Sequence, residues 1–453
     1  MSLSAIILAG GQGTRMKSDI PKVLHRAAGE PLIVHVLRAL APLEAEPLAI
    51  ITGHRADEVR AALGNGYLYV KQTNQLGTGH AVLQARPLLE GKAEDVLVLY
   101  GDHPLTTTST LEQVWEAHRR ERSILTFLAF YPQDPTGYAR VLRDPPERGG
   151  RVRRVVEEVV ASPEEKQVGE AVSGVLCFKD AWLWSNLERA RPHPQKGELF
   201  LTDLISLALE DGEPVAAPHA QDEAEAQGVN TRIELAQAEA ILRQRVRQRL
   251  MLGGVSMIDP PSTFIDSSVA IGRDTLIYPG TLIEGQTIIG ARCRIGPQAH
   301  IRDSQLGDDC IIQASTVESS MLEGDIQVGP YSHLRPGSRI GREVHIGNYV
   351  EIKEASIGPG THIGHFAYIG DASIGRRVNI GAGTITCNFD GVKKNRTVIE
   401  DGAFIGSDTM LVAPVTVGRG AVTGAGSVVT RDVPPGALAV GVPARLVQRN
   451  TES

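Results

Sequence analysis

The sequence predicts two domains of different architecture, an α/β domain followed by a parallel β-helix. The chain has 453 residues and so exceeds the size at which one hydrophobic core usually stops growing. Glycine is unevenly spread, with 19 in residues 1–250 and 29 in residues 251–453, while all three tryptophans lie in the first part. From residue 265 onward, an aliphatic residue recurs at every sixth position. The two parts therefore follow different structural rules.

Composition places the chain among globular proteins and excludes several functional classes. Hydrophobic residues make up 42% and charged residues 22%, which is typical of a packed chain rather than a disordered one. A net charge of -7 leaves no global basic field, so we expect no nucleic-acid partner and no stable membrane association. The apolar run at 3–9 is too short for a signal peptide or a membrane span. The four scattered cysteines lack CxxC spacing, and we expect free thiols in a reducing cytoplasm.

The first domain opens with a short apolar strand at 4–9 that leads into a glycine-rich turn at 10–16. Such turns let backbone N–H groups approach phosphates. Met16 stands where a dinucleotide fingerprint requires glycine, and no Walker A Gly-Lys-Ser/Thr follows. The run Leu-Ala-Gly-Gly-x-Gly-Thr-Arg-Met, continued by Pro21-Lys22, resembles the sugar-nucleotide pyrophosphorylases. That resemblance implies the nucleotidyltransferase variant of the α/β doubly wound fold, with a mixed sheet. Arg15 and Lys22 suit a triphosphate, although solvated surface charge is the alternative.

A second buried strand, at 96–100, leads to Asp102. Ligands of open α/β sheets bind beyond the carboxyl ends of the strands, so Asp102 is placed to hold Mg²⁺. The alternative is that Asp102 caps a helix near 106–114. Gln72 lies near another polar, glycine-rich loop at 75–80, and its amide matches the edge of uracil in donor and acceptor type.

A long helix from Arg232 to about Leu250 links the two parts. Thr231 and Glu234 fit a capping box at the start of this helix. The alternative to a ligand-binding role for Asn230 is therefore that it only forms part of the turn before the helix. We predict a first domain at 1–229, a helical linker at 230–252, and a second domain with its C-terminal tail at 253–453.

The repeat defines the second domain. Its aliphatic residues keep the interval of six from Ile265 to Ile301 and, after short slips, as far as Val429. A period of six is neither helical nor that of an amphipathic strand. It fits a three-sided parallel β-helix, with one strand and one corner per hexad and about nine coils. An irregular β-sandwich would need this register by chance. The pattern resembles the hexapeptide-repeat, left-handed β-helix family.

One polar segment, 381–396, interrupts the repeat and carries Asn388, Lys393, Lys394, Asn395 and Arg396. A basic loop on a repetitive scaffold is more often functional than accidental. The alternative is a tolerated surface insertion.

The two halves, in this order, resemble a family of bacterial bifunctional enzymes over residues 4–440. These enzymes combine an N-acetylglucosamine-1-phosphate uridyltransferase with a glucosamine-1-phosphate N-acetyltransferase, and they supply UDP-N-acetylglucosamine for cell-wall precursors. The resemblance implies UTP, sugar phosphates and acetyl-CoA as small-molecule substrates, Mg²⁺ for uridyl transfer, and a cytoplasmic homotrimer assembled through the β-helix.

The resemblance also implies the residues of the uridyltransferase site. Arg15 and Lys22 are the implied catalytic cations, and Asp102 and Asn230 the implied Mg²⁺ ligands. The implied UDP-N-acetylglucosamine site comprises Leu8, Ala9, Gly10, Gly11, Lys22, Gln72, Gly77, Thr78, Tyr100, Gly101, Asp102, Ala139, Glu157, Ser173 and Asn230. Ala139 stands where the family usually has glycine and Ser173 where it has asparagine, so the sugar contacts depart from the family pattern.

For acetyl transfer, five histidines lie on the repeat, and spacing does not choose among them: His300, His333, His345, His362 and His365. The resemblance assigns the proton acceptor to His365, because a neutral imidazole can take the proton of the attacking amine. It assigns the sugar-phosphate contacts to Arg335, Lys353, Tyr368 and Asn379, and the acetyl-CoA contacts to Ala382, Asn388, Phe389, Ser407, Ala425 and Arg445. Phe389 replaces the usual tyrosine, and the ending at 441–445 departs from the family.

Two alternatives keep the β-helix out of catalysis. It would serve for trimerisation and regulation, as in other sugar-nucleotide pyrophosphorylases, or as a structural scaffold. The motif residues Arg335, Lys353 and His365, with the inserted loop, favour acetyl transfer.

Overall fold

The structure is a computed structural model, which describes residues 2–146, 149–190 and 197–447. The chain divides into two compact units, Met1–Leu242 and Arg243–Ser453. The division falls inside helix α8 (Arg232–Leu252), within the segment that the sequence predicts as a linker. In the part of the chain that is described, no helix is both long and apolar enough to cross a membrane.

A nine-stranded mixed sheet forms the first unit. Its strand order is β11-β7-β10-β6-β1-β4-β5, and β8 pairs with β10 and β9. β1 runs parallel to β4 and β6, whereas β10 is antiparallel to β6 and β7. The bounds are β1 Leu3–Ala9, β4 Leu48–Thr52, β5 Leu68–Lys71, β6 Asp95–Tyr100, β7 Leu125–Phe130, β8 Arg140–Asp144, β9 Arg151–Val156, β10 Ala171–Lys179 and β11 Val215–Ala216, with a separate ribbon of β2 Arg26–Ala27 and β3 Glu30–Pro31.

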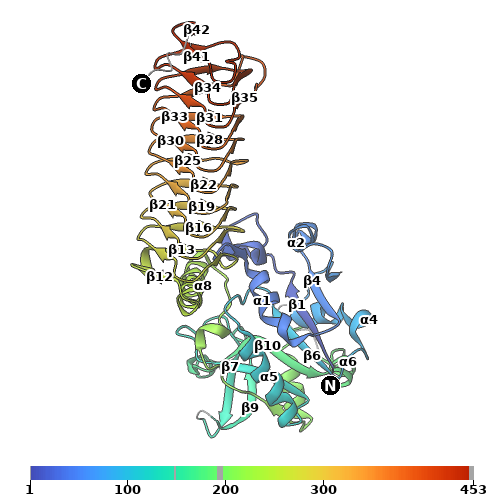
Figure 1. The fold of residues 1–453 in the computed structure, drawn as a ribbon. Coiled ribbons are helices and arrows are strands. Elements are labelled where there is room, and N and C mark those ends of the chain that lie inside the picture. Colours follow the sequence, from blue (N-terminus) through green and yellow to red (C-terminus); the bar gives the residue numbers. More distant parts are fainter. Residues whose placement is uncertain (1, 147–148, 191–196, 448–453) are drawn as a thin grey trace. The chain divides into compact units, whose positions relative to one another are not determined.

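Helices cover both faces of this sheet (Figure 1). Ile7 packs in one core with Val36 of α1, and Ile6 packs in a second core with Val82 of α3 and Trp184 of α6. Neighbouring residues of a strand point to opposite faces, so burial on both faces explains the continuous apolar run of β1. The bounds are α1 Leu32–Leu40, α2 Ala56–Leu63, α3 Thr78–Leu83, α4 Arg86–Leu89, α5 Thr108–Arg120, α6 Asp180–Asn186 and α7 Asp203–Glu210. The predicted doubly wound fold is confirmed.

The start of α5 excludes the alternative role of Asp102. β6 ends at Tyr100, and Asp102 follows in a turn at the carboxyl end of the strand. α5 begins at Thr108, and the side chain of its N-cap residue Thr107 accepts from the N–H of Thr110 at 3.3 Å. Because Thr107 fills the capping position, Asp102 does not cap this helix.

Three parallel sheets form the second unit, and we number them as the first, second and third face. The first face contains β12 Ser256–Met257, β15 Leu276–Ile277, β18 Arg294–Ile295, β21 Ile311–Ile312, β24 Gln327–Val328, β27 His345–Ile346, β30 His362–Ile363, β33 Asn379–Ile380, β36 Phe404–Ile405, β39 Val422–Thr423, β41 Leu438–Val440 and the antiparallel β42 Arg445–Val447. The second face contains β13 Phe264–Ile265, β16 Leu282–Glu284, β19 His300–Arg302, β22 Thr316–Glu318, β25 His333–Leu334, β28 Glu351–Lys353, β31 Tyr368–Gly370, β34 Ile385–Cys387, β37 Met410–Val412 and β40 Val428–Val429. The third face contains β14 Ala270–Ile271, β17 Ile288–Ile289, β20 Gln305–Leu306, β23 Met321–Leu322, β26 Arg339–Ile340, β29 Ser356–Ile357, β32 Ala372–Ile374, β35 Thr397–Ile399 and β38 Val415–Val417.

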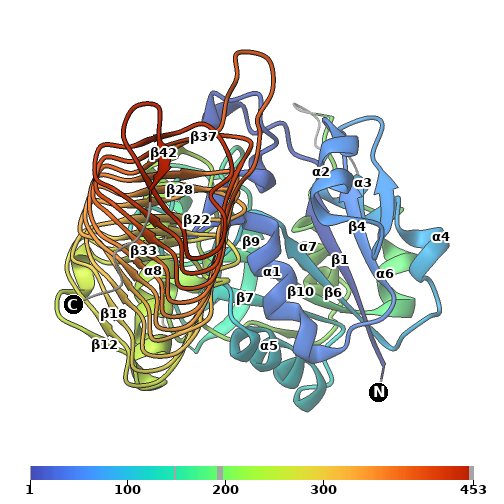
Figure 2. The same ribbon diagram turned by 45° about the horizontal axis from the view of Figure 1, so that its top comes forward.

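The hexad residues form the core of this prism. Ile283, Ile301, Ile346 and Ile352 are fully buried, and their neighbours of the same register join one continuous hydrophobic core. Figures 1 and 2 show the coils stacked on one another. The repeat therefore forms the predicted left-handed β-helix. The four cysteines are free thiols, as expected: Cys177, Cys293, Cys310 and Cys387.

The corner between the first and second faces repeats with one backbone geometry. Tyr349 and Phe366 both occupy the left-handed region there, with φ of 55° and 53°. The N–H of Phe366 donates to the carbonyl of Asn348 at 3.2 Å, and the N–H of Gly383 donates to the carbonyl of His365 at 2.9 Å. Successive corners are thus hydrogen-bonded in register.

Candidate functional site

A hollow of about 320 Å³ lies at the carboxyl ends of β1 and β6. Its lining is Leu8, Ala9, Gly10, Gly11, Lys22, Val23, Gln72, Gln75, Gly77, Thr78, Ala81, Tyr100, Asp102 and Glu198. Most of the residues implied for UDP-N-acetylglucosamine line this hollow: Leu8, Ala9, Gly10, Gly11, Lys22, Gln72, Gly77, Thr78, Tyr100 and Asp102. Gly101 connects two of these residues. The two glycine-rich segments and the end of β6 therefore converge on one space. Gln75 and Glu198 are additional lining residues that the sequence did not single out.

Two glycines of these segments are sterically required. Gly13 has φ 61°, and a Cβ there would lie 2.8 Å from the Cβ of Lys22. Gly77 has φ 97°, and a Cβ there would lie 2.4 Å from the carbonyl oxygen of Leu199. A side chain at either position would be strained and would clash, so the tight loop geometry depends on glycine.

Gln72 is oriented inside the first hollow by two fixed contacts. Its Nε2 donates to the carbonyl of Gly77 at 3.1 Å and lies 2.9 Å from Nδ1 of His80. Its Oε1 is on the side of Gly10, 3.4 Å from where a Cβ of that glycine would stand. The amide thus presents an acceptor beside the glycine-rich turn, as an interaction with the N–H of a uracil ring requires.

A second hollow of about 250 Å³ adjoins the first. The two share Lys22, Thr78, Tyr100 and Asp102. The remaining lining of the second hollow is Arg15, His103, Thr136, Gly137, Tyr138, Ala139, Glu157, Val172, Ser173, Gly174, Phe200, Thr202, Asn230 and Glu234. The residues implied for the sugar, Ala139, Glu157 and Ser173, all line it. The implied site residues therefore sort into two adjoining spaces.

At the junction, one ammonium joins the two implied metal ligands. Lys22 forms an ion pair with Asp102 and donates to Oδ1 of Asn230 at 3.1 Å, while Nη2 of Arg15 donates to the same Oδ1 at 2.9 Å. Burial raises the pKa of Asp102, but attraction to Lys22 and His103 and the hydrogen bonds to the carboxylate together outweigh it, so the pKa stays below its ordinary value. Asp102 is therefore ionised at neutral pH.

The oxygens at this junction fit a divalent cation. The carboxylate of Asp102 and the amide oxygen of Asn230 both contact the ammonium of Lys22. Oxygen ligands of these two kinds are ones that Mg²⁺ binds. The start of α8 does not use the side chain of Asn230, because the carboxylate of Glu234 accepts from the N–H of Thr231 at 2.6 Å and completes the capping box. Among the described residues, no cluster of three or more His, Cys, Asp or Glu side chains could hold a metal ion. A metal at this junction would therefore rely on few protein ligands and on substrate oxygens.

The two departures from the family pattern, Ala139 and Ser173, both line the second hollow and have different consequences. Ala139 is not among the residues in the left-handed region, so its methyl group fits the backbone there. Ser173 donates its hydroxyl to the carbonyl of Ala226 at 3.1 Å, within a buried contact. The serine hydroxyl is thus committed to the backbone, whereas an asparagine would extend farther into the hollow. Glu157 is held by the hydroxyl of Thr202.

His103 is a lining residue that sequence reasoning missed. Its imidazole is buried against Gly174 and Gly228, where a Cβ would lie 2.8 Å and 2.7 Å from ring atoms. Burial lowers the pKa of His103, so the ring is neutral at neutral pH. Nothing in the Gly-Asp-His-Pro run marks this side chain for a ligand, and only the packing of distant glycines places it in the hollow.

In the second unit, several implied residues share one edge of the prism. His365, Ala382, Ser407 and Ala425 occupy the same corner position of four successive coils. The N–H of Asp408 donates to the carbonyl of Ala382 at 2.7 Å, and in the next coil the N–H of Gly426 donates to the carbonyl of Ser407 at 2.8 Å. These bonds keep the successive corners aligned. The implied proton acceptor and three implied coenzyme contacts therefore form one line along the edge.

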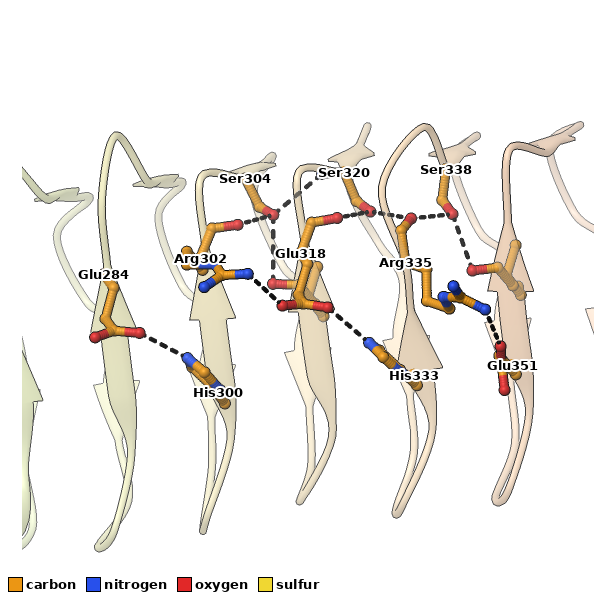
Figure 3. Close-up of polar contacts among 12 residues, drawn as sticks. Glu284, His300, Arg302, Ser304, Glu318, Ser320, His333, Arg335, Ser338 and Glu351 are labelled. Carbon is orange, nitrogen blue, oxygen red and sulfur yellow. Dashed lines mark hydrogen bonds and ion pairs between the residues drawn. The ribbon is translucent and has the colours of Figure 1, made fainter.

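The second face carries a ladder of alternating charges (Figure 3). The contacts are His300–Glu284 at 2.8 Å, Arg302–Glu318 at 2.7 Å, His333–Glu318 at 2.9 Å and Arg335–Glu351 at 2.7 Å. Hydrogen bonding from His333 lowers the pKa of Glu318 against the opposing effect of burial. Up to the coil that carries Glu351, each positive group of the ladder is paired with a carboxylate.

The alternation ends at Lys353. Its ammonium faces that of Lys394, from the inserted loop, and this like charge lowers the pKa of Lys353. In the described structure, neither lysine forms an ion pair with a carboxylate. Asp371 is the carboxylate that attracts both lysines, so the two ammonium groups beside Arg335 leave a net cationic site of the kind that a phosphate requires. The sequence named Lys394 as part of the loop but did not place it with Lys353.

The inserted loop brings Asn388 to the same face. Its Nδ2 donates to the hydroxyl of Tyr368 at 3.4 Å and to the Asp371 carboxylate at 2.5 Å. Phe389 follows on the loop with its ring 60% exposed. Asn388 thus anchors the loop, and Phe389 is presented to solvent without a hydroxyl.

Two implied residues lie apart from this group within the chain. Asn379 is on β33 of the first face, whereas Lys353 and Tyr368 are on strands of the second face and Arg335 directly follows β25 of that face. Arg445 is on β42, the last strand of the first face, and is exposed.

Family models match both units. A MobA-like NTP transferase domain matches residues 5–182, and the bacterial transferase hexapeptide model matches residues 268–303 and 396–431. A third model, described as GlmU-like, C-terminal hexapeptide, matches residues 291–373.

Full-length relatives match the whole chain. A protein of Heliobacterium modesticaldum named "Bifunctional protein GlmU" is 48% identical over 437 residues, which cover 96% of this chain and 95% of the relative. Proteins of the same name from Syntrophomonas wolfei and Carboxydothermus hydrogenoformans are 45% and 44% identical. Those matches cover 97% of each chain for the former and 99% of each chain for the latter.

Proposed function

This chain belongs to the bifunctional GlmU family, and from this premise we propose which of its residues carry each activity. It is a transferase with two activities, which together make UDP-N-acetylglucosamine for cell-wall precursors. The β-helix acetylates glucosamine-1-phosphate from acetyl-CoA, and the α/β unit then transfers the uridyl group of UTP to N-acetylglucosamine-1-phosphate. The alternatives without acetyl transfer are thereby excluded.

For uridyl transfer, we place the nucleotide in the first hollow and the sugar phosphate in the second. An oxygen of the sugar phosphate attacks the α-phosphorus of UTP in line, and the bond to pyrophosphate breaks as the new P–O bond forms. The reacting phosphorus then lies at the junction, where Lys22 and Arg15 neutralise the developing charge. The observation that supports this placement is the Lys22–Asp102 ion pair in the lining of both hollows.

We assign Mg²⁺ to Asp102 and Asn230. When bound, the ion supplies charge neutralisation at the phosphate oxygens of the nucleotide. Lys22 holds the same two oxygens in this structure, so its ammonium must move from them for an ion to bind. Arg15 and the backbone N–H groups of the glycine-rich turn orient the phosphates throughout.

For acetyl transfer, we place the sugar phosphate at Arg335, Lys353 and Tyr368 and the coenzyme along the corner that carries His365. The amine nitrogen attacks the thioester carbonyl carbon, a C–N bond forms, and the C–S bond breaks. His365 takes the proton that the nitrogen loses and passes it to the leaving thiolate of coenzyme A, so that free thiol forms and the imidazole is neutral again. The line of His365, Ala382, Ser407 and Ala425 along one edge supports this assignment.

We propose a homotrimer in which neighbouring β-helices complete this second site. Asn379 lies on a different face from Arg335, Lys353 and Tyr368, so one chain does not present all four on one surface. A second copy that offers its first face to this second face would supply Asn379. We place the reactions in the cytoplasm, in keeping with the four free thiols.

The assignment of His365 is tested by His365→Ala, with both activities measured in one preparation. Release of free coenzyme A thiol should fall by about 10²–10⁴-fold, because a positioned base contributes that factor. Release of pyrophosphate from UTP should be unchanged. A variant that keeps its acetyl-transfer rate but dissociates would show that His365 serves assembly instead.

A further inference from the structure

His365 has a side-chain partner that neither motif nor resemblance indicated. Nδ1 of its imidazole contacts Oδ1 of Asn348, which occupies the same corner one coil earlier. The backbones of the two corners are also joined, through the bond from the N–H of Phe366 to the carbonyl of Asn348. Asn348 therefore contacts the ring of the proposed base and also accepts from the backbone N–H of the next residue, Phe366.

The chemistry of this contact fixes the position of the proton. An amide oxygen only accepts hydrogen bonds, so Nδ1 of His365 must carry the hydrogen and donate it to Asn348. In a neutral imidazole, the other nitrogen, Nε2, then has the free electron pair. We propose that Asn348 is a positioning residue for acetyl transfer, which holds His365 in the tautomer whose Nε2 takes the proton of the attacking amine. This inference rests on the proposed role of His365.

The packing around the pair restricts the ring further. A Cβ at Gly347 would lie 3.3 Å from Nδ1 of His365 and 1.8 Å from the carbonyl oxygen of Gly364, so no larger side chain fits beneath the imidazole. On the same corner, the exposed rings of Tyr331, Tyr349 and Phe366 stack with centroids 5.5 Å and 5.2 Å apart. This aromatic stack joins the coils that carry Asn348 and His365, and it keeps the two corners aligned.

The charges that face His365 favour a neutral partner. His345 of β27 and His362 of β30 have ring centroids 6.0 Å apart, and His345 also interacts electrostatically with His365. In the described structure, no carboxylate forms an ion pair with His365. Burial and the neighbouring histidines lower the pKa of His345. The next corner of the prism, at 381–383, is uncharged. Asn348 therefore orients the ring without adding a negative charge that would favour the imidazolium, which cannot act as a base.

The first test removes the amide and asks whether rate or binding changes. Asn348→Ala should lower kcat for acetyl transfer by about 10- to 100-fold, as loss of a group that orients a histidine does in comparable sites. The KM for glucosamine-1-phosphate should change by less than about threefold, because Asn348 is not proposed to touch substrate. Pyrophosphate release should be unchanged. Gln313→Ala is the matched control, since it removes an amide from the same edge two coils away from Asn348.

The second test keeps an acceptor but adds a charge. Asn348→Asp should restore most of the maximal rate, because a carboxylate also accepts from Nδ1–H. The acidic limb of its kcat/KM profile should move to higher pH by about one unit, since a negative charge stabilises the imidazolium. A purely structural role for Asn348 predicts an unmoved limb, and that result would overturn the proposal.

A double variant separates this proposal from the one on which it rests. If Asn348 acts through His365, then His365→Ala combined with Asn348→Ala should be no slower than His365→Ala alone. A further loss of about tenfold in the double variant would mean that Asn348 acts independently, and the proposal would be wrong. If His365→Ala itself keeps its rate, the role of His365 fails first. If only Asn348→Ala keeps its rate, only the positioning role fails.

Discussion

The ammonium of Lys22 forms an ion pair with the carboxylate of Asp102 where two hollows of the α/β unit meet. Both side chains are largely shielded from solvent, with exposed fractions of 16% and 10%. The pair therefore keeps a buried carboxylate ionised before any ligand arrives. In the uridyl transfer that we propose, it also marks the place where the phosphates of the two substrates come together.

Asp102→Ala should reduce pyrophosphate release from UTP by at least about 100-fold, because charge neutralisation at a transferred phosphoryl group carries this chemistry. Acetyl transfer should be unchanged. The measurement is pyrophosphate and free-thiol release over a series of Mg²⁺ concentrations. Thr107→Ala is the control, since it removes the actual cap of α5 at a cost of about 1 kcal/mol in stability and should leave both rates intact. Normal uridyl transfer in Asp102→Ala would exclude the metal role.

Lys353→Ala should raise the KM for glucosamine-1-phosphate by about 10- to 100-fold, the effect of losing one charged hydrogen bond. The difference from the wild type should shrink as salt concentration rises. Arg302→Ala is the matched control, because Arg302 lies on the same face but is neutralised by Glu318 at 2.7 Å. An equal rise in KM for both variants would assign the effect to the general field of the face and not to a phosphate contact.

Asp390→Ala should loosen the inserted loop and lower kcat/KM for acetyl-CoA by about tenfold. Asp390 accepts from the N–H groups of Val392 and Lys393 at 2.9 Å and 2.8 Å and from the amide of Asn395 at 2.8 Å. These bonds, the backbone one from Lys393 foremost, lower the pKa of Asp390 to about 2. The loop therefore keeps its anchor at every pH used in an assay.

Asp390→Asn provides a graded comparison for this loop. It retains an acceptor for the two backbone N–H groups but places its own NH₂ group against the Asn395 amide. Its activity should lie between that of the wild type and that of Asp390→Ala. Unchanged acetyl transfer in both variants would support the alternative that the loop is a tolerated insertion.

Asp95→Asn should destabilise the α/β unit by about 3 kcal/mol near neutral pH, because it leaves buried partners of a charge unpaired. Burial acts to raise the pKa of Asp95, but bonds from His118, Lys179 and Trp115 outweigh it and lower the pKa. A lowered folded-state pKa gives stability that is present above the unfolded value, near 4, and is lost as pH falls. Most of that stability is still present at pH 4 and is lost as pH falls further toward the folded pKa, so denaturant unfolding at pH 7 and at pH 3 should show a smaller difference between wild type and variant at pH 3. An equal difference at both would contradict this account.

The sequence predicts the fold of both units well, because the pattern of apolar residues within each segment determines which side chains are buried. An aliphatic residue at every sixth position requires a coil with one inward side chain per strand, and Ile283, Ile301 and Ile346 are fully buried accordingly. The continuous apolar run of β1 likewise requires burial on both faces. These features depend on neighbouring residues alone.

The site depends on contacts that no local rule describes. Asn348 meets His365 because two corners stack, and His103 enters the second hollow because glycines from two distant segments leave room for it. Lys394 reaches Lys353 through a loop that breaks the repeat. The resemblance supplied residue roles by motif, and residues outside a motif had no signal to reveal them.

The edge that carries His365, Ala382, Ser407 and Ala425 also sets lengths in fixed steps. Adjacent parallel strands are about 4.8 Å apart, so the three intervals from His365 to Ala425 span about 14 Å. A ligand stretched along this edge is measured in whole coils, and no smaller increment is available without breaking the register of the stack. Removing or adding one complete coil between His365 and Ala425 would shorten or lengthen the reach by about 4.8 Å, while the core of the prism would remain continuous. Coil number is thus a variable through which such a protein matches the length of an extended ligand.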